Sequence, residues 1–222
     1  MKVGVDGVLL GAWADVADAQ NVLDIGTGSG LIALMVAQRN STASIEAIDI
    51  DEDAVAQAQI NFRNSVYSAR ISEKNSDFRK FMPENKKFDH IVCNPPFFVN
   101  SLQSPENQRT TARHSISLTH EELLEGAKKL VTEKGKISLI LPVAEGNKAT
   151  DIATKFGLTL HRKTIVFPKP AKAAKRFLLE FVSSQNAENK IIIENSLTIE
   201  TEQRGIYTKE YTELVKDFYL KM

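Results

Sequence analysis

Residues 21–30 read Asn-Val-Leu-Asp-Ile-Gly-Thr-Gly-Ser-Gly, and residues 31–39 that follow are mostly apolar at helical spacing. The pattern predicts a short buried strand, a tight glycine loop and a helix. Glycines spaced in this way let the backbone approach a ligand closely, and they present the N–H groups of a helix N-terminus to it. Such a unit is typical of α/β proteins, in which parallel strands alternate with helices.

Polar residues follow this strand and the next three expected strands. These strands are predicted at residues 44–49, 69–75 and 88–93, with a helix at 51–64 after the first of them. The polar residues at or just beyond the four strand ends are Asp24, Asp49, Asp77 and Asn94. Because ligands bind at the carboxyl ends of parallel strands, these side chains predict one crevice. The second of the acids lies about 20 residues after the last glycine, where doubly wound folds hydrogen-bond a ribose.

The rest of the chain completes a single domain over residues 1–222. We expect a doubly wound, Rossmann-like fold with a mostly parallel seven-stranded sheet. An antiparallel hairpin is expected at the edge of the sheet, formed by residues 157–167 and 176–183. A helical segment at 1–20 precedes the sheet, and residues 185–222 form a C-terminal appendage of strands and a helix. Further expected elements are helices at 8–16, 119–131, 147–156 and 208–219 and short strands at 136–141, 190–194 and 197–200.

The composition excludes several classes of protein. Lys plus Arg (28) balance Asp plus Glu (28), so there is no global positive field of the kind that marks many nucleic-acid binders. No apolar run approaches the roughly 18 residues that span a membrane. The N-terminus lacks a secretory signal and Cys93 is the only cysteine, so we expect a cytoplasmic protein. The four histidines show no metal-ligand spacing, and no metal site is expected.

One stretch nevertheless concentrates positive charge. Residues 152–179 contain no Asp or Glu, and Pro168-Lys169-Pro170 within them forms a stiff loop. We interpret the stretch as a surface for an anionic partner, with a solvated face as the alternative. Its lysines and arginines are Lys155, Arg162, Lys163, Lys169, Lys172, Lys175 and Arg176, of which the last four are the candidate RNA contacts.

The turn Asn94-Pro95-Pro96-Phe97 is the candidate catalytic element. Its two prolines make the backbone rigid and leave carbonyls without ladder partners. The Asn94 amide oxygen and the Pro95 carbonyl can accept the two hydrogens of an exocyclic NH2 group, while Phe97 stacks on its ring. The alternative is a proline-rich turn without a catalytic role.

A long polar loop at about residues 99–118 follows this turn and carries Arg109, Arg113 and His114. Loops of this length inside a compact domain are uncommon and are usually functional. We expect a lid that contacts RNA, although these charges also suit a merely solvated loop.

The glycine loop and the strand ends suit a ligand without phosphate. Asp24, just before the loop, would repel phosphate but would suit an ammonium group, and S-adenosylmethionine carries an ammonium, a ribose and an adenine. Together with Asp49, Asp77 and the Asn-Pro-Pro-Phe turn, the loop resembles class I S-adenosylmethionine-dependent methyltransferases that act on exocyclic or amide nitrogens. The resemblance implies that Asp24 and the loop residues Gly26, Thr27, Gly28 and Gly30 hold the methionine part of the cofactor. It implies that Asp49 binds the ribose and that Asp77 binds the adenine amino group. Ile50, Phe78 and Asn94 are further candidate cofactor contacts.

Within that class the chain resembles the bacterial tRNA1(Val) adenine-N6 methyltransferase family. The resemblance is carried by residues 1–13, 109–114, 168–170, 175–181 and 207–220. It implies N6 methylation of the adenine next to the anticodon (position 37), with a valine tRNA as partner. Family members usually carry a leader before the Lys-Val-Gly stretch, and we expect this leader to be missing here. They also commonly have a threonine at the position of Val5.

Three alternatives share parts of this pattern. Ribosomal RNA guanine-N2 methyltransferases and protein glutamine-N5 methyltransferases also use an Asn-Pro-Pro turn, although the glutamine enzymes usually have tyrosine in place of Phe97. A non-enzymatic RNA-binding or assembly factor with the same fold is the third. Intact polar residues at all four strand ends favour an enzyme.

Overall fold

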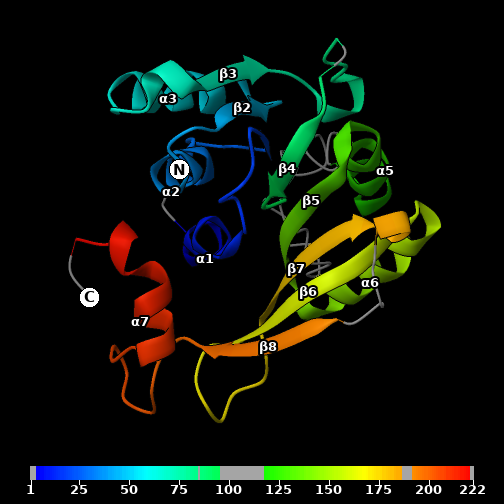
Figure 1. Cartoon of the computed structure of the whole chain (residues 1–222). Coiled ribbons are helices and arrows are strands. Elements are labelled where there is room, and N and C mark those ends of the chain that lie inside the picture. The colour runs from blue at the N-terminus through cyan, green and yellow to red at the C-terminus, as the bar shows by residue number, and fades with distance from the viewer. Residues whose placement is uncertain (1–3, 85, 96–117, 187–191, 221–222) are drawn as a thin grey trace, which may run out of the picture.

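The computed structural model describes residues 4–84, 86–95, 118–186 and 192–220. Its sheet has eight strands in the order β3-β2-β1-β4-β5-β7-β6-β8 (Figure 1). In chain order the strands are β1 (Asn21–Ile25), β2 (Ser44–Asp49), β3 (Ile71–Asn75), β4 (Phe88–Cys93), β5 (Val131–Pro142), β6 (Leu158–Phe167), β7 (Arg176–Ser183) and β8 (Ile193–Thr198). Within this sheet β7 is antiparallel to both of its neighbours, and every other described pair is parallel.

Helices cover both faces of the sheet. One face carries α1, α2, α3 and α7, and the other carries α5 and α6. The α-helices are α1 (Val5–Trp13), α2 (Leu31–Arg39), α3 (Glu52–Arg63), α5 (His120–Leu130), α6 (Val143–Lys155) and α7 (Lys209–Val215). Short 3-10 turns are η1 (Ser68–Arg70), η2 (Phe78–Lys80), η3 (Ser184–Asn186) and η5 (Lys216–Phe218). No helix in the described ranges is long and apolar enough to cross a membrane.

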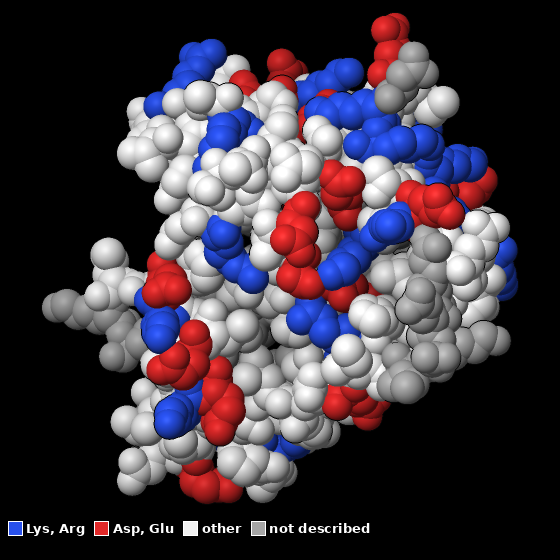
Figure 2. All heavy atoms as spheres, in the orientation of Figure 1, with Lys and Arg blue, Asp and Glu red and all other residues white. Residues whose placement is uncertain are grey.

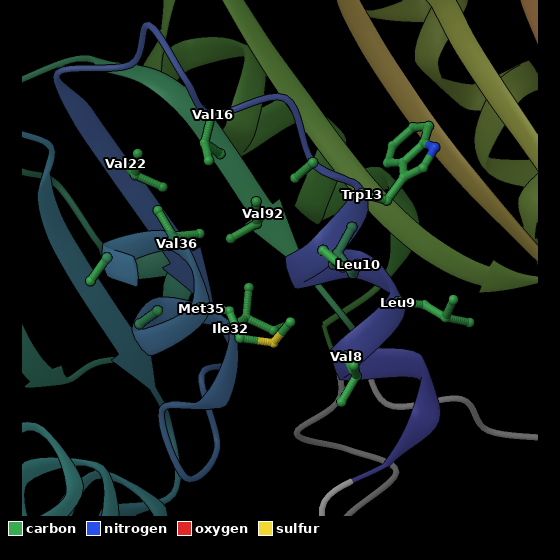
Figure 3. Close-up of a cluster of buried hydrophobic side chains, with 14 of the residues drawn as sticks. Val8, Leu9, Leu10, Trp13, Val16, Val22, Ile32, Met35, Val36 and Val92 are labelled. Atoms are coloured by element: carbon green, nitrogen blue, oxygen red, sulfur yellow. The ribbon is translucent and has the colours of Figure 1, made fainter. Parts of the chain in front are cut away.

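Successive residues of the central strands enter opposite cores, because side chains alternate along a strand. On β1, Val22 lies in the core under α1 and α2, whereas Leu23 lies in the core under α5 and α6. Figure 3 shows the first core, where Leu10 of α1 approaches Ile32 and Met35 of α2. This packing places the start of α2, and hence the glycine loop before it, firmly against the sheet.

Charges of both signs are interleaved on the surface. Figure 2 shows lysine and arginine side chains lying among acidic ones over the face displayed, in keeping with a formal net charge of zero. A local excess of lysines in the sequence therefore does not by itself make a positive surface.

The α/β class, the parallel strand order around β1 and the glycine loop are confirmed. The number of strands is wrong, because Ile193–Thr198 pairs with β6 in parallel and adds an eighth strand to the seven expected. The β6–β7 hairpin is confirmed, but β8 covers its outer side, so it does not form the edge. Among the described residues, one strand also replaces the two short ones expected at 190–194 and 197–200.

Helix boundaries differ in smaller ways. The first helix begins at Val5 rather than at residue 8, so that Asp6 lies in its first turn and not before it. The helix expected at 119–131 begins with a capping box: the Thr119 hydroxyl accepts from the Glu122 N–H, and the Glu122 carboxylate accepts from the Thr119 N–H. This box fixes where α5 starts.

Candidate active site

Neighbouring strands bring the four polar strand ends to one edge of the sheet. Ile25 of β1 is paired with Ile48 on one side and with Cys93 on the other, one residue before Asp49 and Asn94. Beyond β3, the Ser76 N–H donates to the carbonyl of Asp49 over 2.9 Å, which brings Asp77 next to the end of β2. The edge therefore presents three carboxylates and one amide side by side.

Asp24 is completely buried at the end of β1. Its Oδ2 accepts from the Thr27 hydroxyl at 2.7 Å and from the Ala33 N–H at 3.2 Å, whereas Oδ1 has no partner in the described chain. Burial, which disfavours the charged form, raises the pKa of Asp24 to about 7. A cationic group placed at the free oxygen would stabilise the ionised carboxylate.

The glycine loop folds back over the end of β2. The N–H groups of Gly26 and Thr27 donate to the Ile48 carbonyl at 2.9 and 3.0 Å. Gly26 has φ +69° and a Cβ added there would meet nothing within 4 Å, so its backbone borders open space. At Gly30 an added Cβ would lie 2.3 Å from the Phe62 ring, so that glycine permits the close packing of α3.

Asp49 joins the loop to the start of α3. Its two carboxylate oxygens accept from the N–H groups of Gly28 at 2.8 Å and Asp51 at 3.0 Å. Each oxygen can accept a second hydrogen bond, which leaves capacity for a ribose diol. The next side chain, Ile50, is 47% exposed and offers an apolar surface beside it.

Asp77 and Phe78 follow β3 in different environments. The Asp77 carboxylate is half-buried and is held by Arg79, with Nη2 2.7 Å from Oδ2. The Phe78 ring packs into the core below α5, so only its backbone lies at the crevice. Sequence reasoning selected Asp77 but missed Arg79, although the acid-x-arginine spacing at the start of a turn was visible.

The structure describes only the first half of the candidate catalytic turn, Asn94 and Pro95. Asn94 follows β4 with a buried Oδ1 that has no hydrogen-bond partner in the described part of the chain, and Pro95 beside it is buried. Cys93 before it is the last residue of β4 and is buried, and burial raises the pKa of its thiol. The remaining predicted residues of this region lie outside the described residues: Pro96, Phe97, Arg109, Arg113 and His114.

These observations fit S-adenosylmethionine. The free oxygen of buried Asp24 suits an ammonium, the open space beside Gly26 admits a ligand against the backbone, and Asp49 retains acceptors for a diol. Three carboxylates along the edge would repel a phosphorylated ligand instead.

A scan against protein-family models matches residues 7–159 to the methyltransferase small domain. The chain belongs to this methyltransferase family. It is an enzyme of the class I methyltransferases, and S-adenosylmethionine is its cofactor. The family assignment agrees with the resemblance found from the sequence alone.

Curated relatives match the chain over its whole length. Proteins named tRNA1(Val) (adenine(37)-N6)-methyltransferase from Parabacteroides distasonis and Trichodesmium erythraeum are 46% and 43% identical, each over 100% of this chain and 92% of the relative. A protein of the same name from Vibrio vulnificus is 42% identical over 100% of this chain and 90% of the relative.

Solved structures share the fold at lower identity. A predicted O-methyltransferase from Agrobacterium tumefaciens superposes with a TM-score of 0.73 at 17% identity, covering 96% of both chains. TrmN from Thermus thermophilus gives 0.57 at 20% identity over 80% of this chain and 48% of that one. These likenesses place the fold among class I methyltransferases.

The positively charged stretch of this methyltransferase is largely paired with acids from elsewhere in the chain. Lys169 lies 3.2 Å from Glu200, and Arg176 lies 2.8 Å from Asp6 of α1. Three more ion pairs involve Lys155 with Glu121, Arg162 with Glu180 and Lys163 with Glu194. Lys172 and Lys175, by contrast, are exposed on the loop after β6.

That loop, residues 168–175, leaves the sheet at the edge that carries the crevice. Strand β6 runs in the same direction as β1, β4 and β5, since β7 between β5 and β6 is antiparallel to both. The carboxyl end of β6 therefore lies on the same edge as those of β1 and β4. The exposed Lys172 and Lys175 therefore follow the same edge of the sheet as the four polar strand ends.

Proposed function

We propose that this methyltransferase transfers a methyl group from S-adenosylmethionine to the exocyclic N6 of adenine 37 in a valine tRNA in the cytoplasm. The observation that carries the proposal is the similarity to relatives of that stated activity, 46% identical over all of this chain. The name of these relatives states the base, the position and the tRNA.

The geometry at the end of β4 supports an amino group as the methyl acceptor. Asn94 Oδ1 is a buried acceptor with no described partner, and such an atom carries a free-energy cost until a donor reaches it. An N6 hydrogen can be that donor. The Pro95 carbonyl next to it is assigned to the second hydrogen, and Phe97, which lies outside the described residues, to stacking on the base.

These contacts would act by alignment. The bound cofactor would supply a methyl group on a positively charged sulfur, which leaves as a neutral thioether, and Asn94 and Pro95 would hold the amine in line with that group. Holding two reactants in this geometry can lower the barrier by about 7–11 kcal/mol. Acceptors at Asn94 and Pro95 would direct the nitrogen lone pair to the methyl carbon, and the N6 proton leaves after transfer. A loop base can be splayed into the crevice at little cost because it is not paired.

The test is methylation of unmodified tRNA from a strain without adenine-N6 methylation, using labelled S-adenosylmethionine and nucleoside analysis of the product. We expect N6-methyladenosine in one valine tRNA, at position 37. Label in ribosomal RNA as N2-methylguanosine, or in a release-factor glutamine, would replace the proposed substrate by that of a related methyltransferase. Absence of label in every substrate despite bound cofactor would favour a binding role and contradict the proposal.

A further inference from the structure

Arg79 makes an extensive set of contacts with Asp77 at the end of β3. Its Nε lies 2.9 Å from Oδ1 and 3.0 Å from Oδ2, and its Nη2 lies 2.7 Å from Oδ2. Its backbone N–H also donates to Oδ1 over 3.0 Å. Both oxygens of one carboxylate are thereby held by one neighbouring residue. Hydrogen bonding from the Arg79 side chain lowers the pKa of Asp77, so the group is an acceptor at neutral pH.

The pair is attached to the wall of the cofactor crevice. The Ser76 N–H donates to the Asp49 carbonyl at 2.9 Å, and the Asn75 amide donates to the Ile50 carbonyl at 3.1 Å. These bonds tie the chain just before Asp77 to the segment that bears the candidate ribose and adenine contacts. An exposed ion pair usually contributes little to stability, so its place at the crevice is the more informative feature.

The turn that carries Arg79 is anchored on its other side. The Phe78 ring is buried below α5, where a Cβ on Gly126 would come within 2.6 Å of it. The Arg79 Nη1 lies 3.9 Å from Glu122, which forms the capping box of α5. Arg79 thus lies between the crevice and the start of α5, with Asp77 on one side and Glu122 on the other.

We propose that Arg79 is a positioning residue that fixes the Asp77 carboxylate so that it accepts a hydrogen bond from the amino group of the cofactor adenine. The inference rests on the adenine-cofactor site of the proposed function, but not on which substrate receives the methyl group. An arginine fork restrains both oxygens in one plane. The single Nε hydrogen is shared between the two oxygens, and when it is assigned to the nearer Oδ1, Oδ2 accepts only from Nη2 and keeps a lone pair for the ligand. Because an ionised carboxylate only accepts, a fixed one favours a purine with an amino group over one with an oxo group at the same carbon.

The experiment compares two ligands by calorimetric titration. They are S-adenosylhomocysteine and S-inosylhomocysteine, which differ in carrying an amino or an oxo group on the purine. We expect the unsubstituted protein to prefer the amino ligand by about 10-fold to 100-fold, the range for one hydrogen bond to a charged group. In Arg79→Ala we expect the ratio of the two affinities to fall to within about threefold of the ratio in Asp77→Ala. The reason is that a mobile carboxylate no longer discriminates between the amino and the oxo ligand.

Two further variants separate positioning from charge. Arg79→Lys keeps the positive charge but not the fork, and we expect it to lose most of the preference. Lys80→Ala removes a positive charge from the same 3-10 turn but keeps the Lys80 backbone N–H, which donates to the Asp77 carbonyl at 2.9 Å, and we expect it to keep the preference. Adding Arg79→Ala to Asp77→Ala should change the preference no further.

The proposal would be overturned if Arg79→Ala and Arg79→Lys lowered the affinity for both ligands equally and left the preference intact. Arg79 would then have a structural role only. An unchanged preference in Asp77→Ala would also overturn it, by removing the carboxylate from adenine recognition. Neither titration contains tRNA, so failure of tRNA methylation with a normal preference would count against the proposed substrate alone.

Discussion

Asn94 presents a buried amide oxygen that accepts no hydrogen bond from the described chain. If that oxygen accepts from the substrate amine, Asn94→Ala should reduce turnover by at least about 100-fold, the size of effect seen when one transition-state hydrogen bond is removed. Affinity for S-adenosylhomocysteine should change by less than about threefold, because its proposed contacts lie mainly on β1 and β2. Single-turnover rates and titration measure the two quantities.

The matched control for this prediction is Asn195→Ala, which removes the same amide from an exposed position on β8. It should leave both turnover and affinity unchanged. A loss of cofactor affinity in Asn94→Ala as large as the loss of rate would instead assign Asn94 to the cofactor.

Gly26 and Gly157 offer a controlled comparison at the level of single residues. Both have φ +69°, and an added Cβ meets nothing within 4 Å at either position. Alanine should therefore cost each site a similar strain, about 1–2 kcal/mol of stability. Only Gly26 lies in the cofactor loop, so Gly26→Ala should also weaken S-adenosylhomocysteine binding at least about tenfold, while Gly157→Ala should not. Chemical unfolding and titration of both variants would check this, and equal affinities would move the ligand away from Gly26.

The contact between α5 and η2 links the packing of α5 to the position of Asp77 at the crevice. Alanine in place of a helical glycine usually stabilises a helix by about 1 kcal/mol. At Gly126 the added Cβ would lie 2.6 Å from the Phe78 ring, which is buried. We expect Gly126→Ala to destabilise the protein by about 1–3 kcal/mol, the usual effect of overpacking, and to weaken cofactor binding by shifting Asp77.

Glu125→Ala is the matched control on α5, because Glu125 is the exposed neighbour of Gly126. It should have a small effect on unfolding and none on cofactor affinity. Stabilisation by Gly126→Ala would show that the Phe78 ring relaxes freely, contrary to the packing argument.

Substitutions in the loop at 168–175 can show which of its lysines contact the tRNA. Lys172 and Lys175 are exposed at the edge that bears the crevice, whereas Lys169 lies 3.2 Å from Glu200. Each alanine substitution at Lys172 or Lys175 should raise the KM for tRNA and lower the salt slope of tRNA binding by about 1, with kcat unchanged. Lys134→Ala, in the amino-terminal part of β5, is the control and should change neither. Unaltered salt slopes in both loop variants would exclude them as phosphate contacts.

Local signals explain which elements were predictable. The strand, loop and helix at 21–39 follow from periodicity and glycine spacing within one short stretch, and the structure places their boundaries as predicted. Strand β8 was mispredicted because its middle is polar, with Glu194, Asn195 and Ser196 in succession, and only pairing with distant β6 makes it a strand. Its parallel register depends on contacts that no local pattern contains.

The same distinction applies to the site. Asp24, Asp49 and Asn94 were predictable because each lies at or just beyond the end of a recognisable strand, and strand ends of a parallel sheet share an edge. The free positive charge of residues 152–179 was overestimated from the sequence, because Asp6, Glu180 and Glu200, which lie outside that stretch, form ion pairs with its cations. Its role as a surface for an anionic partner stays a prediction. Charge counted along a chain omits the acids that folding brings to it.

At the scale of the whole molecule, two buried groups bind protons with opposite effects on stability. Burial raises the pKa of Asp24 to about 7, so between about pH 4 and 7 the folded state holds a proton that the unfolded state has lost, and stability falls as pH rises. Burial lowers the pKa of His90 to about 3, so between about pH 3 and 6.5 the unfolded state holds the extra proton, and stability falls as pH drops.

His90 owes this shift to its surroundings in the sheet as well as to burial. Its Nε2 lies 2.9 Å from the Ser138 hydroxyl, and the charges that act on it come from Lys136, Arg162 and Asp15, the first two lowering and the last raising its pKa. A neutral imidazole bonded to a hydroxyl is satisfied, whereas an imidazolium there would be desolvated beside two cations.

Over the shared range, about pH 4 to 6.5, the two slopes have opposite signs and a similar limit of about 1.4 kcal/mol per pH unit. When one of the two groups is removed from the cofactor-free protein, we therefore expect the pH dependence of stability to be set by the group that remains. Relative to the unsubstituted protein, Asp24→Asn should gain about 2–3 kcal/mol of stability as pH rises from about 4.5 to 6.5, and His90→Gln should lose a similar amount. Urea unfolding at both pH values measures the difference, and the double variant should return to the pH profile of the unsubstituted protein.

Parallel pH profiles for Asp24→Asn and the unsubstituted protein would mean that Asp24 stays ionised in the fold. Its free oxygen would then have to be stabilised by a donor already present in the chain, and the case for an ammonium-binding acid at the end of β1 would be lost.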